Sequence, residues 1–360
     1  MAKVFKAIVA ILILALLGAV VYATVTSTGN GNGNVEKARI ISVDEIKIPK
    51  KVDADNLFGL FFFNEDGSKT STMAGYDKIN FDPKKPTVIF IHGMQMNNGY
   101  NDYDPIPNPL GWLEAGYNFG VYFWSQFADC ETPGNGKLKI WLRGNGWFYY
   151  EDDNGKRVKE SEDVLEYTTS EVFVAYYLDL LKNVNYSGSS ITIAGHSLGA
   201  NTTIAATSYL VTLYDQGSIE KSVLPDRVVL LDAYMDAVDE EGKTVPWLNT
   251  TIGKDGIIGR ARTTMKRAHE IGISTEYVKS CTFVSFLSDL ATYEGMSKTL
   301  FDEMLYIDFN NDYTGLNFGD SHVASMDWWL NSISASLRYD SAVADSGVLG
   351  YTARTPLSVT

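Results

Sequence analysis

Cysteine and histidine are scarce in this sequence, and their scarcity excludes several kinds of protein. The chain of 360 residues contains two cysteines and four histidines. Two cysteines cannot build the cross-linked framework of a small disulfide-rich domain. With so few histidines beside them, they cannot supply the ligands of a Cys₄ or Cys₂His₂ zinc site either. The position of each histidine is therefore informative.

Basic residues are also in deficit. There are 30 Lys and Arg residues against 44 Asp and Glu, which gives a formal net charge of −14 at pH 7. A chain this acidic repels the phosphate backbone of nucleic acids, so we expect no nucleic-acid partner. Hydrophobic residues make up 45% of the sequence and charged residues 21%, which excludes wholesale disorder and a fibrous or coiled-coil chain.

The sequence lacks long hydrophobic runs beyond residue 23, which excludes a polytopic membrane protein. The one run, Ala7–Ala23, follows Lys3 and Lys6 and ends in small residues that permit cleavage after Ala23. Residues 1–23 are therefore predicted to be the signal peptide of a secreted protein, or alternatively an uncleaved membrane anchor through residues 7–23. Residues 24–34, rich in Gly and Asn, are predicted to be a flexible linker to one folded domain, residues 35–360.

Strands and helices are predicted to alternate along that domain. The predicted strands are Ala38–Ile48, Leu57–Phe63 (paired with the first), Pro86–Ile91, Phe119–Trp124, Ser190–Ala194, Arg227–Leu231, Tyr277–Phe286 and Met304–Phe309. The predicted helices are Ser161–Lys182, Leu198–Tyr214, Ile257–Ile271 and Val323–Leu337. Several strands are hydrophobic at every position, which is typical of strands buried on both faces. The pattern predicts an α/β fold with a mostly parallel central sheet and helices on both faces.

Two insertions interrupt the alternation, Gln126–Glu160 and Ala233–Gly256. The first lies between a strand and the helix that follows it, where a lid-like or substrate-shaping insertion is expected. Aromatic residues gather in this insertion and before it: Trp112, Trp141, Trp147, Phe148, Tyr149 and Tyr150. They are interpreted either as a hydrophobic wall over a substrate or as a hairpin that packs its own small core.

The strongest single motif is Gly195-His196-Ser197-Leu198-Gly199, which lies between a predicted strand and a predicted helix. Strand, sharp turn and helix is the context in which G-x-S-x-G presents a nucleophilic serine. Gly195 and Gly199 are required because a Cβ atom at either position would collide with the neighbouring strand and helix. The turn holds the Ser197 hydroxyl clear of the sheet, at the positive end of the helix that follows.

Three motifs in the expected order make the chain resemble the secreted lipases and esterases of the α/β-hydrolase fold. They are IFIHGM, AGHSLGA and SHVASMDWW, and the resemblance covers Lys85–Trp329, about two-thirds of the chain. The AGHSLGA block and the strand-terminal HG are shared with pancreatic-type lipases in particular. The resemblance implies an α/β-hydrolase fold and a Ser-His-acid triad that requires no metal or organic cofactor. In the usual strand order of that fold, Cys130 and Cys281 lie too far apart for a disulfide, so both are expected to be unpaired.

Backbone N–H groups must stabilise the oxyanion that forms when a serine attacks an acyl carbonyl. One donor is expected to be the amide of Leu198, which follows the nucleophile. The second is expected from the loop after the Pro86–Ile91 strand, and the resemblance assigns it to Met94. Gly93 is expected to let this backbone approach the substrate closely.

His322 is the expected general base. It follows the last predicted strand on a loop and precedes an aromatic helix, and α/β-hydrolases use the chain order Ser, acid, His. His92 is expected to form a hydrogen bond within its own loop, and His196 is expected to be buried under the site. His269 lies in a basic helical stretch that is expected to face solvent.

The triad acid must orient the imidazole of His322 and stabilise its protonated form. Asp232 directly follows the Arg227–Leu231 strand, as in pancreatic-type lipases, although this chain has Ala233 where those proteins usually have Pro. Most α/β-hydrolases carry the acid one strand later, which leaves as alternatives Asp289 at that position, and also Asp236 and Asp239.

Together these residues predict an exported serine hydrolase that cleaves carboxylic esters. The expected substrates are small-molecule or lipid esters, acylglycerols first among them, with a lipid interface as a further partner. The same triad serves polyesterases, feruloyl-type esterases and phospholipases. In a different class, a non-catalytic cell-surface binding protein could retain the fold.

Overall fold

The computed structural model describes residues 38–96, 106, 108–234, 241–248, 250–253, 256–280, 304–308 and 318–333. The predicted signal peptide or anchor (residues 1–23) and the predicted linker (residues 24–34) lie outside these ranges. Within these ranges, none of the helices has both the length and the hydropathy that a membrane-spanning segment needs.

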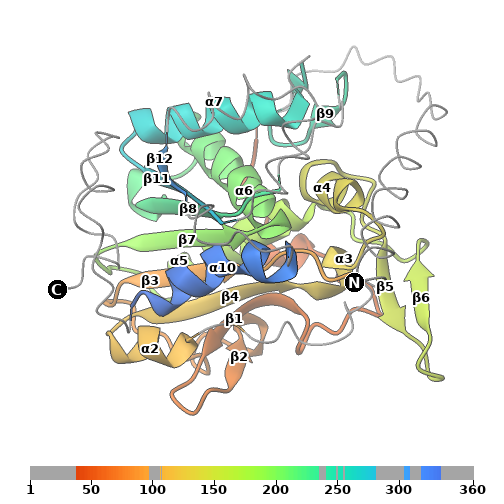
Figure 1. Ribbon diagram of the computed structural model, residues 1–360, viewed down its shortest axis with the longest axis horizontal. Coiled ribbons are helices and arrows are strands. Elements are labelled where there is room, and N and C mark those ends of the chain that lie inside the picture. The colour runs from red at the N-terminus through yellow and green to blue at the C-terminus, as the bar shows by residue number, and fades with distance from the viewer. Residues whose placement is uncertain are drawn as a thin grey trace.

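An eight-stranded sheet forms the centre of the molecule (Figure 1). Its order is β12-β11-β8-β7-β3-β4-β1-β2, and the six strands from β12 to β4 run parallel, whereas β1 is antiparallel to both of its neighbours. The strands are β1 Phe58–Phe63, β2 Lys69–Ser71, β3 Thr87–Ile91, β4 Asn118–Trp124, β7 Ile191–His196, β8 Arg227–Leu231, β11 Ser274–Lys279 and β12 Leu305–Asp308. The predicted mostly parallel sheet is confirmed.

Helices cover both faces of this sheet (Figure 1). Helices α5, α6 and α7 lie on one face, and α2 and α10 lie on the other. The α-helices are α2 Pro109–Glu114, α3 Ser125–Ala128, α4 Pro133–Trp141, α5 Thr169–Asn183, α6 Leu198–Asp215, α7 Gly256–Glu270 and α10 Phe318–Asn331. Shorter elements are the 3₁₀ turns Val43–Glu45, Thr72–Ala74 and Lys221–Val223, and two hairpins formed by β5 Phe148–Glu151 with β6 Arg157–Glu160 and by β9 Thr244–Val245 with β10 Thr250–Thr251.

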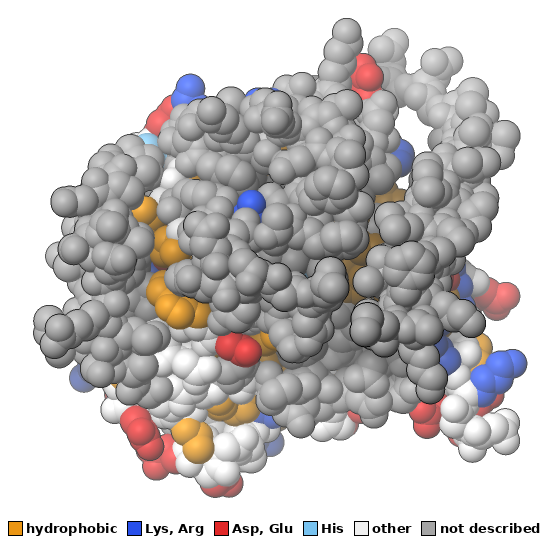
Figure 2. Space-filling view, in the orientation of Figure 1, with side chains coloured by type: hydrophobic (Ala, Val, Ile, Leu, Met, Phe, Trp, Pro, Cys, Tyr) orange, Lys and Arg blue, Asp and Glu red, His pale blue; other side chains and the backbone are white. Residues whose placement is uncertain are grey.

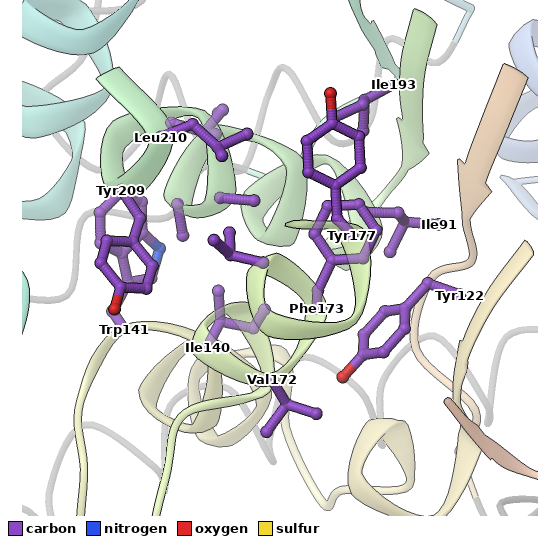
Figure 3. Packing of buried hydrophobic residues seen from close by; sticks show 14 of the residues in the cluster. Ile91, Tyr122, Ile140, Trp141, Val172, Phe173, Tyr177, Ile193, Tyr209 and Leu210 are labelled. Atoms are coloured by element: carbon purple, nitrogen blue, oxygen red, sulfur yellow. The ribbon is translucent and has the colours of Figure 1, made fainter. Parts of the chain in front are cut away.

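The strands contribute side chains to two hydrophobic cores, one on each side of the sheet. In β3, Ile89 and Ile91 enter the core under α5 and α6, whereas Val88 and Phe90 enter the core under α2 and α10. Successive side chains of a strand point to opposite faces, so a strand covered on both sides is hydrophobic throughout. Figure 3 shows the first core, where side chains from α5 lie beside those of the central strands.

Two of the predicted elements differ from the structure at a capping box. Residues 38–48 form no strand but a 3₁₀ turn, because Ser42 and Glu45 cap each other's backbone amides, and β1 pairs with β2 and β4 instead. Helix α5 begins at Thr169 rather than Ser161, because Thr168 and Glu171 form the same reciprocal cap.

The order of the strands reverses direction between β3 and β7. From β3 the chain first adds β4 on one side, then crosses over to add β7, β8 and β11 in succession on the other. In parallel α/β sheets, ligands bind outside the carboxyl ends of the strands at such a reversal. A ligand-binding site is therefore expected at the loops that follow β3 and β7.

The surface offers little contiguous hydrophobic area among the described residues. Four large hydrophobic side chains in these ranges are exposed, and they lie on separate segments: Ile40, Met73, Met96 and Leu110. On the face shown in Figure 2, described hydrophobic side chains are visible only as small separate patches.

Candidate active site

The predicted site residues follow directly after the carboxyl ends of neighbouring strands. Gly93 and Met94 come after β3, Ser197 after β7 and Asp232 after β8. The register pairs Ile91 at the end of β3 with Gly195, and His196 with the last residue of β8. These loops therefore meet at one edge of the sheet, at the reversal between β3 and β7.

Ser197 occupies a strained turn that keeps its hydroxyl out of the helix it precedes. Its backbone has φ 57° and ψ −119°, and its side chain makes no capping hydrogen bond to α6. A serine or threonine in the ordinary extended N-cap conformation accepts such a bond, as Ser42 and Thr168 do. A positive φ in a residue with a Cβ atom is uncommon and often marks a functional position. The Ser197 Oγ is thus left for another partner.

Three glycines make this turn possible. A Cβ atom on Gly93 would lie 2.9 Å from the Cβ of Ser197 and 3.1 Å from the carbonyl oxygen of His196. A Cβ on Gly199 would lie 2.5 Å from the carbonyl oxygen of His92, and one on Gly195 would overlap the backbone of Gly199. Because these neighbours are mainly backbone atoms, they cannot move aside as a flexible side chain could.

Asp232 and His322 are brought together across 90 residues of sequence. The Nδ1 atom of His322 lies 2.6 Å from Oδ2 of Asp232, whose side chain is 1% exposed. A carboxylate oxygen only accepts hydrogen bonds, so Nδ1 carries the proton and Nε2 of the neutral ring is left as a base. The ring of His322 also lies against the ring of His196, the neighbour of Ser197, with their centroids 4.6 Å apart.

The structure corrects the location of His322. The sequence placed it on a loop before a helix that starts at Val323, whereas α10 begins at Phe318 and includes His322. The imidazole is therefore carried by a helix that packs on the sheet. The alternative acids Asp289, Asp236 and Asp239 lie outside the described residues.

Asp232 also has a left-handed backbone, with φ 42°. Its amide donates to the carbonyl of Val278 at 2.7 Å, and its Oδ1 accepts the amide of Ser280 at 3.3 Å. Asp tolerates this conformation better than most residues. Both carboxylate oxygens are thus oriented, one toward the backbone after β11 and the other toward His322.

The other three histidines are poor candidates for the base. Burial lowers the pKa of His92 and of His196 to about 3, so both rings are neutral at pH 7 and ill-suited to accept a proton there. His269 lies in the last turn of α7, next to the start of β11 at Ser274. That is the amino edge of the parallel sheet, opposite Ser197.

His92 holds the loop that carries Met94. Its Nε2 accepts the amide of Trp124 at 3.1 Å, so its Nδ1–H donates to the carbonyl of Gly93 at 2.9 Å. This confirms the expected hydrogen bond within the loop. In a trans peptide unit the C=O and the N–H point in opposite directions, so a fixed Gly93 carbonyl also fixes the direction of the Met94 N–H. The amide of Leu198, as the first in α6, has no acceptor within the helix.

Three supporting residues were not identified from the sequence. Ser280 accepts the amide of Ser325 in α10 at 3.0 Å while its own amide holds Asp232. The amide of Tyr234 donates to the carbonyl of Ser197 at 3.2 Å, and the Asn201 side chain donates to the carbonyl of Tyr234. An isolated Ser, Tyr or Asn carries no sequence signal for such a role, because the residue that it contacts is distant in the sequence.

The insertion between β4 and α5 folds against the site as α3, α4 and the β5–β6 hairpin. Its aromatic residues join the core under α5 and α6, with Phe148 against Phe127 of α3, and the Trp147 ring lies beneath the Lys139 and Lys159 ammonium groups. A Cβ on Gly136 of α4 would meet the Leu198 side chain at 2.5 Å, so this helix packs directly on the turn. The expected hairpin is present as β5 and β6, but its aromatic residues share the main core instead of packing one of their own, and a lid or substrate-wall function stays a prediction.

Two of the six aromatic residues lie away from the hairpin. Trp112 belongs to α2 and packs against Trp329 of α10, with the ring centroids 5.2 Å apart. Trp141 ends α4, and its ring is tilted by 32° against the ring of Trp247, with the centroids 5.8 Å apart. Cys130 is a buried free cysteine, as expected, and Cys281 lies outside the described residues. In the described part of the chain, no group of three or more His, Cys, Asp or Glu side chains is arranged to hold a metal ion.

The fold class follows from three features. They are a strained serine turn at the strand reversal, an aspartate after the next strand and a histidine after the last strand. The chain has the α/β-hydrolase fold. No family model and no curated protein sequence matches it.

Several solved structures of α/β-hydrolases are similar to this chain. Poly(aspartic acid) hydrolase-1 of Sphingomonas sp. KT-1 has 12% identity and a TM-score of 0.37, covering 76% of this chain and 97% of its own. One of two fungal esterases of Rhizomucor miehei has 13% identity and a TM-score of 0.36, covering 89% and 92%. Est1E of Butyrivibrio proteoclasticus, solved with ferulic acid, has 10% identity and a TM-score of 0.31, covering 71% and 92%. With TM-scores this low, the assignment of the fold rests on the strand order and the site.

Proposed function

We propose that this chain is an exported serine hydrolase that cleaves carboxylic esters, with acylglycerols or related lipid esters as substrates. The observation that carries the proposal is the 2.6 Å contact between Nδ1 of His322 and Asp232. It leaves Nε2 of a neutral imidazole as a base, on a ring that lies against the neighbour of Ser197. The strained backbone of Ser197 supports the same role, because its hydroxyl caps no helix.

In the proposed reaction, the Ser197 Oγ attacks the acyl carbonyl while Nε2 of His322 takes its proton. Asp232 stabilises the imidazolium that forms, and the amides of Leu198 and Met94 stabilise the oxyanion. His322 then gives the proton to the leaving alcohol. A water molecule, activated by the same histidine, attacks the acyl-enzyme and releases the carboxylic acid and the free serine.

Two features support the finer parts of the proposal. Met96, two residues after Met94, is 53% exposed, so a flexible hydrophobic side chain is available near the oxyanion loop for contact with an acyl chain. The hydrophobic run at residues 7–23, preceded by two lysines, supports export.

The proposal is tested with Ser197→Ala and, as a matched control, Ser187→Ala at an exposed serine. Ser197→Ala is expected to abolish turnover of p-nitrophenyl esters and labelling by a fluorophosphonate probe, with an unchanged circular dichroism spectrum. Ser187→Ala is expected to behave as the wild type. Retained turnover in Ser197→Ala would rule out the mechanism. A wild type that neither hydrolyses the esters nor reacts with the probe would favour a non-catalytic binding protein.

The substrate class is tested separately. Rates over p-nitrophenyl esters of increasing acyl length, with a triglyceride emulsion alongside, are expected to favour long chains and the emulsion. A preference for acetyl or feruloyl esters would contradict the lipid substrate and leave the serine mechanism intact.

A further inference from the structure

His196 lies between the two parts of the proposed triad, and its side chain has a contact that packing alone does not require. The residue ends β7, where its backbone pairs with Leu231 of β8, and it is 3% exposed. Its Nε2 lies 2.9 Å from the main-chain carbonyl oxygen of His322. The residue just before the nucleophile therefore contacts the backbone of the proposed base.

The chemistry of this contact defines the state of the His196 ring. A carbonyl oxygen only accepts hydrogen bonds, so Nε2 must carry the proton. Burial, and to a lesser degree the nearby His322, lowers the pKa of His196 to about 3, so the ring is neutral and Nδ1 carries no proton. The His196 ring is thus a neutral Nε2–H tautomer.

The other ring nitrogen of His196, Nδ1, shows that packing alone does not explain a histidine at this position. Among the described residues, no hydrogen-bond partner lies within reach of the buried Nδ1 of His196. This atom faces the oxyanion loop, since a Cβ on Gly93 would lie 3.4 Å from it. A buried acceptor without a partner lowers stability, so a leucine or methionine would suit the position better if packing were its only role.

We propose that His196 is a positioning residue, whose Nε2–H holds the His322 carbonyl and thereby sets the distance between the His322 imidazole and the Ser197 hydroxyl. This inference rests on the proposed function. Asp232 holds the side-chain end of His322 and His196 holds its main-chain end, so the imidazole is restrained at both ends. His196 and Ser197 are adjacent at the end of the same strand. The hydrogen bond from His196 to the His322 carbonyl therefore resists any displacement of α10 relative to the nucleophile.

The neutral state of His196 also suits its place beside the base. The two rings lie 4.6 Å apart at 44°. His322 becomes positively charged when it takes the proton from Ser197, and a charged neighbour at this distance would oppose that step. The His196 ring can donate its hydrogen bond without carrying a charge.

The test compares His196→Leu, which removes the donor, with His196→Gln, whose amide nitrogen can occupy the place of Nε2. His269→Gln on α7 is the control. His196→Leu is expected to lower kcat by about 10- to 100-fold with little change in KM, because misplaced catalytic groups slow the chemical step. His196→Gln is expected to recover most of that loss, and His269→Gln to retain the wild-type kcat. Full activity in His196→Leu, or equal losses in the leucine and glutamine variants, would overturn the inference.

A second measurement does not depend on the variants folding. In ¹⁵N-histidine NMR spectra of the wild type, His196 is expected as an Nε2–H tautomer that does not titrate near pH 6. A Nδ1–H tautomer, or titration in that range, would overturn the inference by itself. If instead the wild type fails to react with fluorophosphonate while the NMR tautomer is as expected, the contact stands and the proposed function fails.

Discussion

Replacement of Asp232 by asparagine is the most informative perturbation of the site, because the two side chains have the same shape but differ in hydrogen bonding. Asp232 accepts hydrogen bonds from Nδ1 of His322 at 2.6 Å and from the amide of Ser280 at 3.3 Å. An asparagine has one oxygen and one NH₂ group, so it can satisfy only one of these donors.

Either orientation of the amide damages the site. If its oxygen stays on Ser280, the NH₂ group faces His322, which must then move its proton from Nδ1 to Nε2 and can no longer act as a base. If its oxygen turns to His322, the NH₂ group opposes the buried amide of Ser280. We expect the first, with a loss in kcat of about 10⁴-fold, or about 5 kcal/mol of transition-state stabilisation.

The assay is the steady-state rate with p-nitrophenyl butyrate together with the rate of fluorophosphonate labelling, and both should fall. Asp226→Asn is the matched control, because Asp226 precedes the same strand at its other end and also accepts a backbone amide, that of Ile191 at 2.7 Å. It should leave kcat unchanged. A loss below tenfold in Asp232→Asn, with a large loss in Asp289→Asn, would refute the reasoning and assign the acid to the next strand.

Four further predictions concern other residues. Gly199→Ala brings a methyl group within 2.5 Å of the His92 carbonyl oxygen and should lower the free energy of unfolding by about 3 kcal/mol. At Gly253, an added methyl group has no atom of the described residues within 4 Å, so Gly253→Ala should change it by less than about 1 kcal/mol in the same urea titrations. His92→Leu releases the Gly93 carbonyl and should lower kcat by about 10²-fold. The loss should be smaller in His92→Asn, whose amide can donate in place of Nδ1. Equal losses would contradict the inference that the fixed Gly93 carbonyl orients the Met94 N–H. Burial raises the pKa of Cys130 to about 11, so its thiol should react with Ellman's reagent at pH 8 only after denaturation, and rapid reaction of the native thiol would contradict its burial. Burial lowers the pKa of Lys139 to about 8, so between pH 8 and its ordinary value of 10.5 the unfolded chain binds more protons than the folded chain. Across that window the wild type should gain up to about 3 kcal/mol of stability relative to Lys139→Met, and a constant difference would show that Lys139 titrates normally when folded.

Two mistaken elements show where sequence patterns compete. Residues 38–48 alternate partly in hydrophobicity, but Ser42-x-x-Glu45 is a capping box and its reciprocal hydrogen bonds form a turn instead. The acidic residues after Ser161 suggested a helix start, but the Glu160 side chain accepts the amides of residues 161 and 162 instead. The helix begins only after the capping box at Thr168. In both cases a specific pair of hydrogen bonds outweighed a general pattern.

The sequence by itself determined the features whose causes are local. The parallel strands are visible as continuous hydrophobic runs, because burial on both faces leaves no polar positions. The Ser197 turn is visible because glycine is the only residue that fits beside it, at Gly195 and Gly199. Such signals are contained within a few residues of the chain.

Only the tertiary structure decided which distant groups meet. Several aspartates follow the strands, and the contact between Asp232 and His322 depends on the stacking of β8, β11 and α10 across 90 residues. The helix that carries His322 and the hydrogen bond from His196 to its carbonyl come from the same packing. A hydrogen bond between distant residues requires only that two ordinary polar groups be brought within about 3 Å, and the local sequence of neither residue records the other.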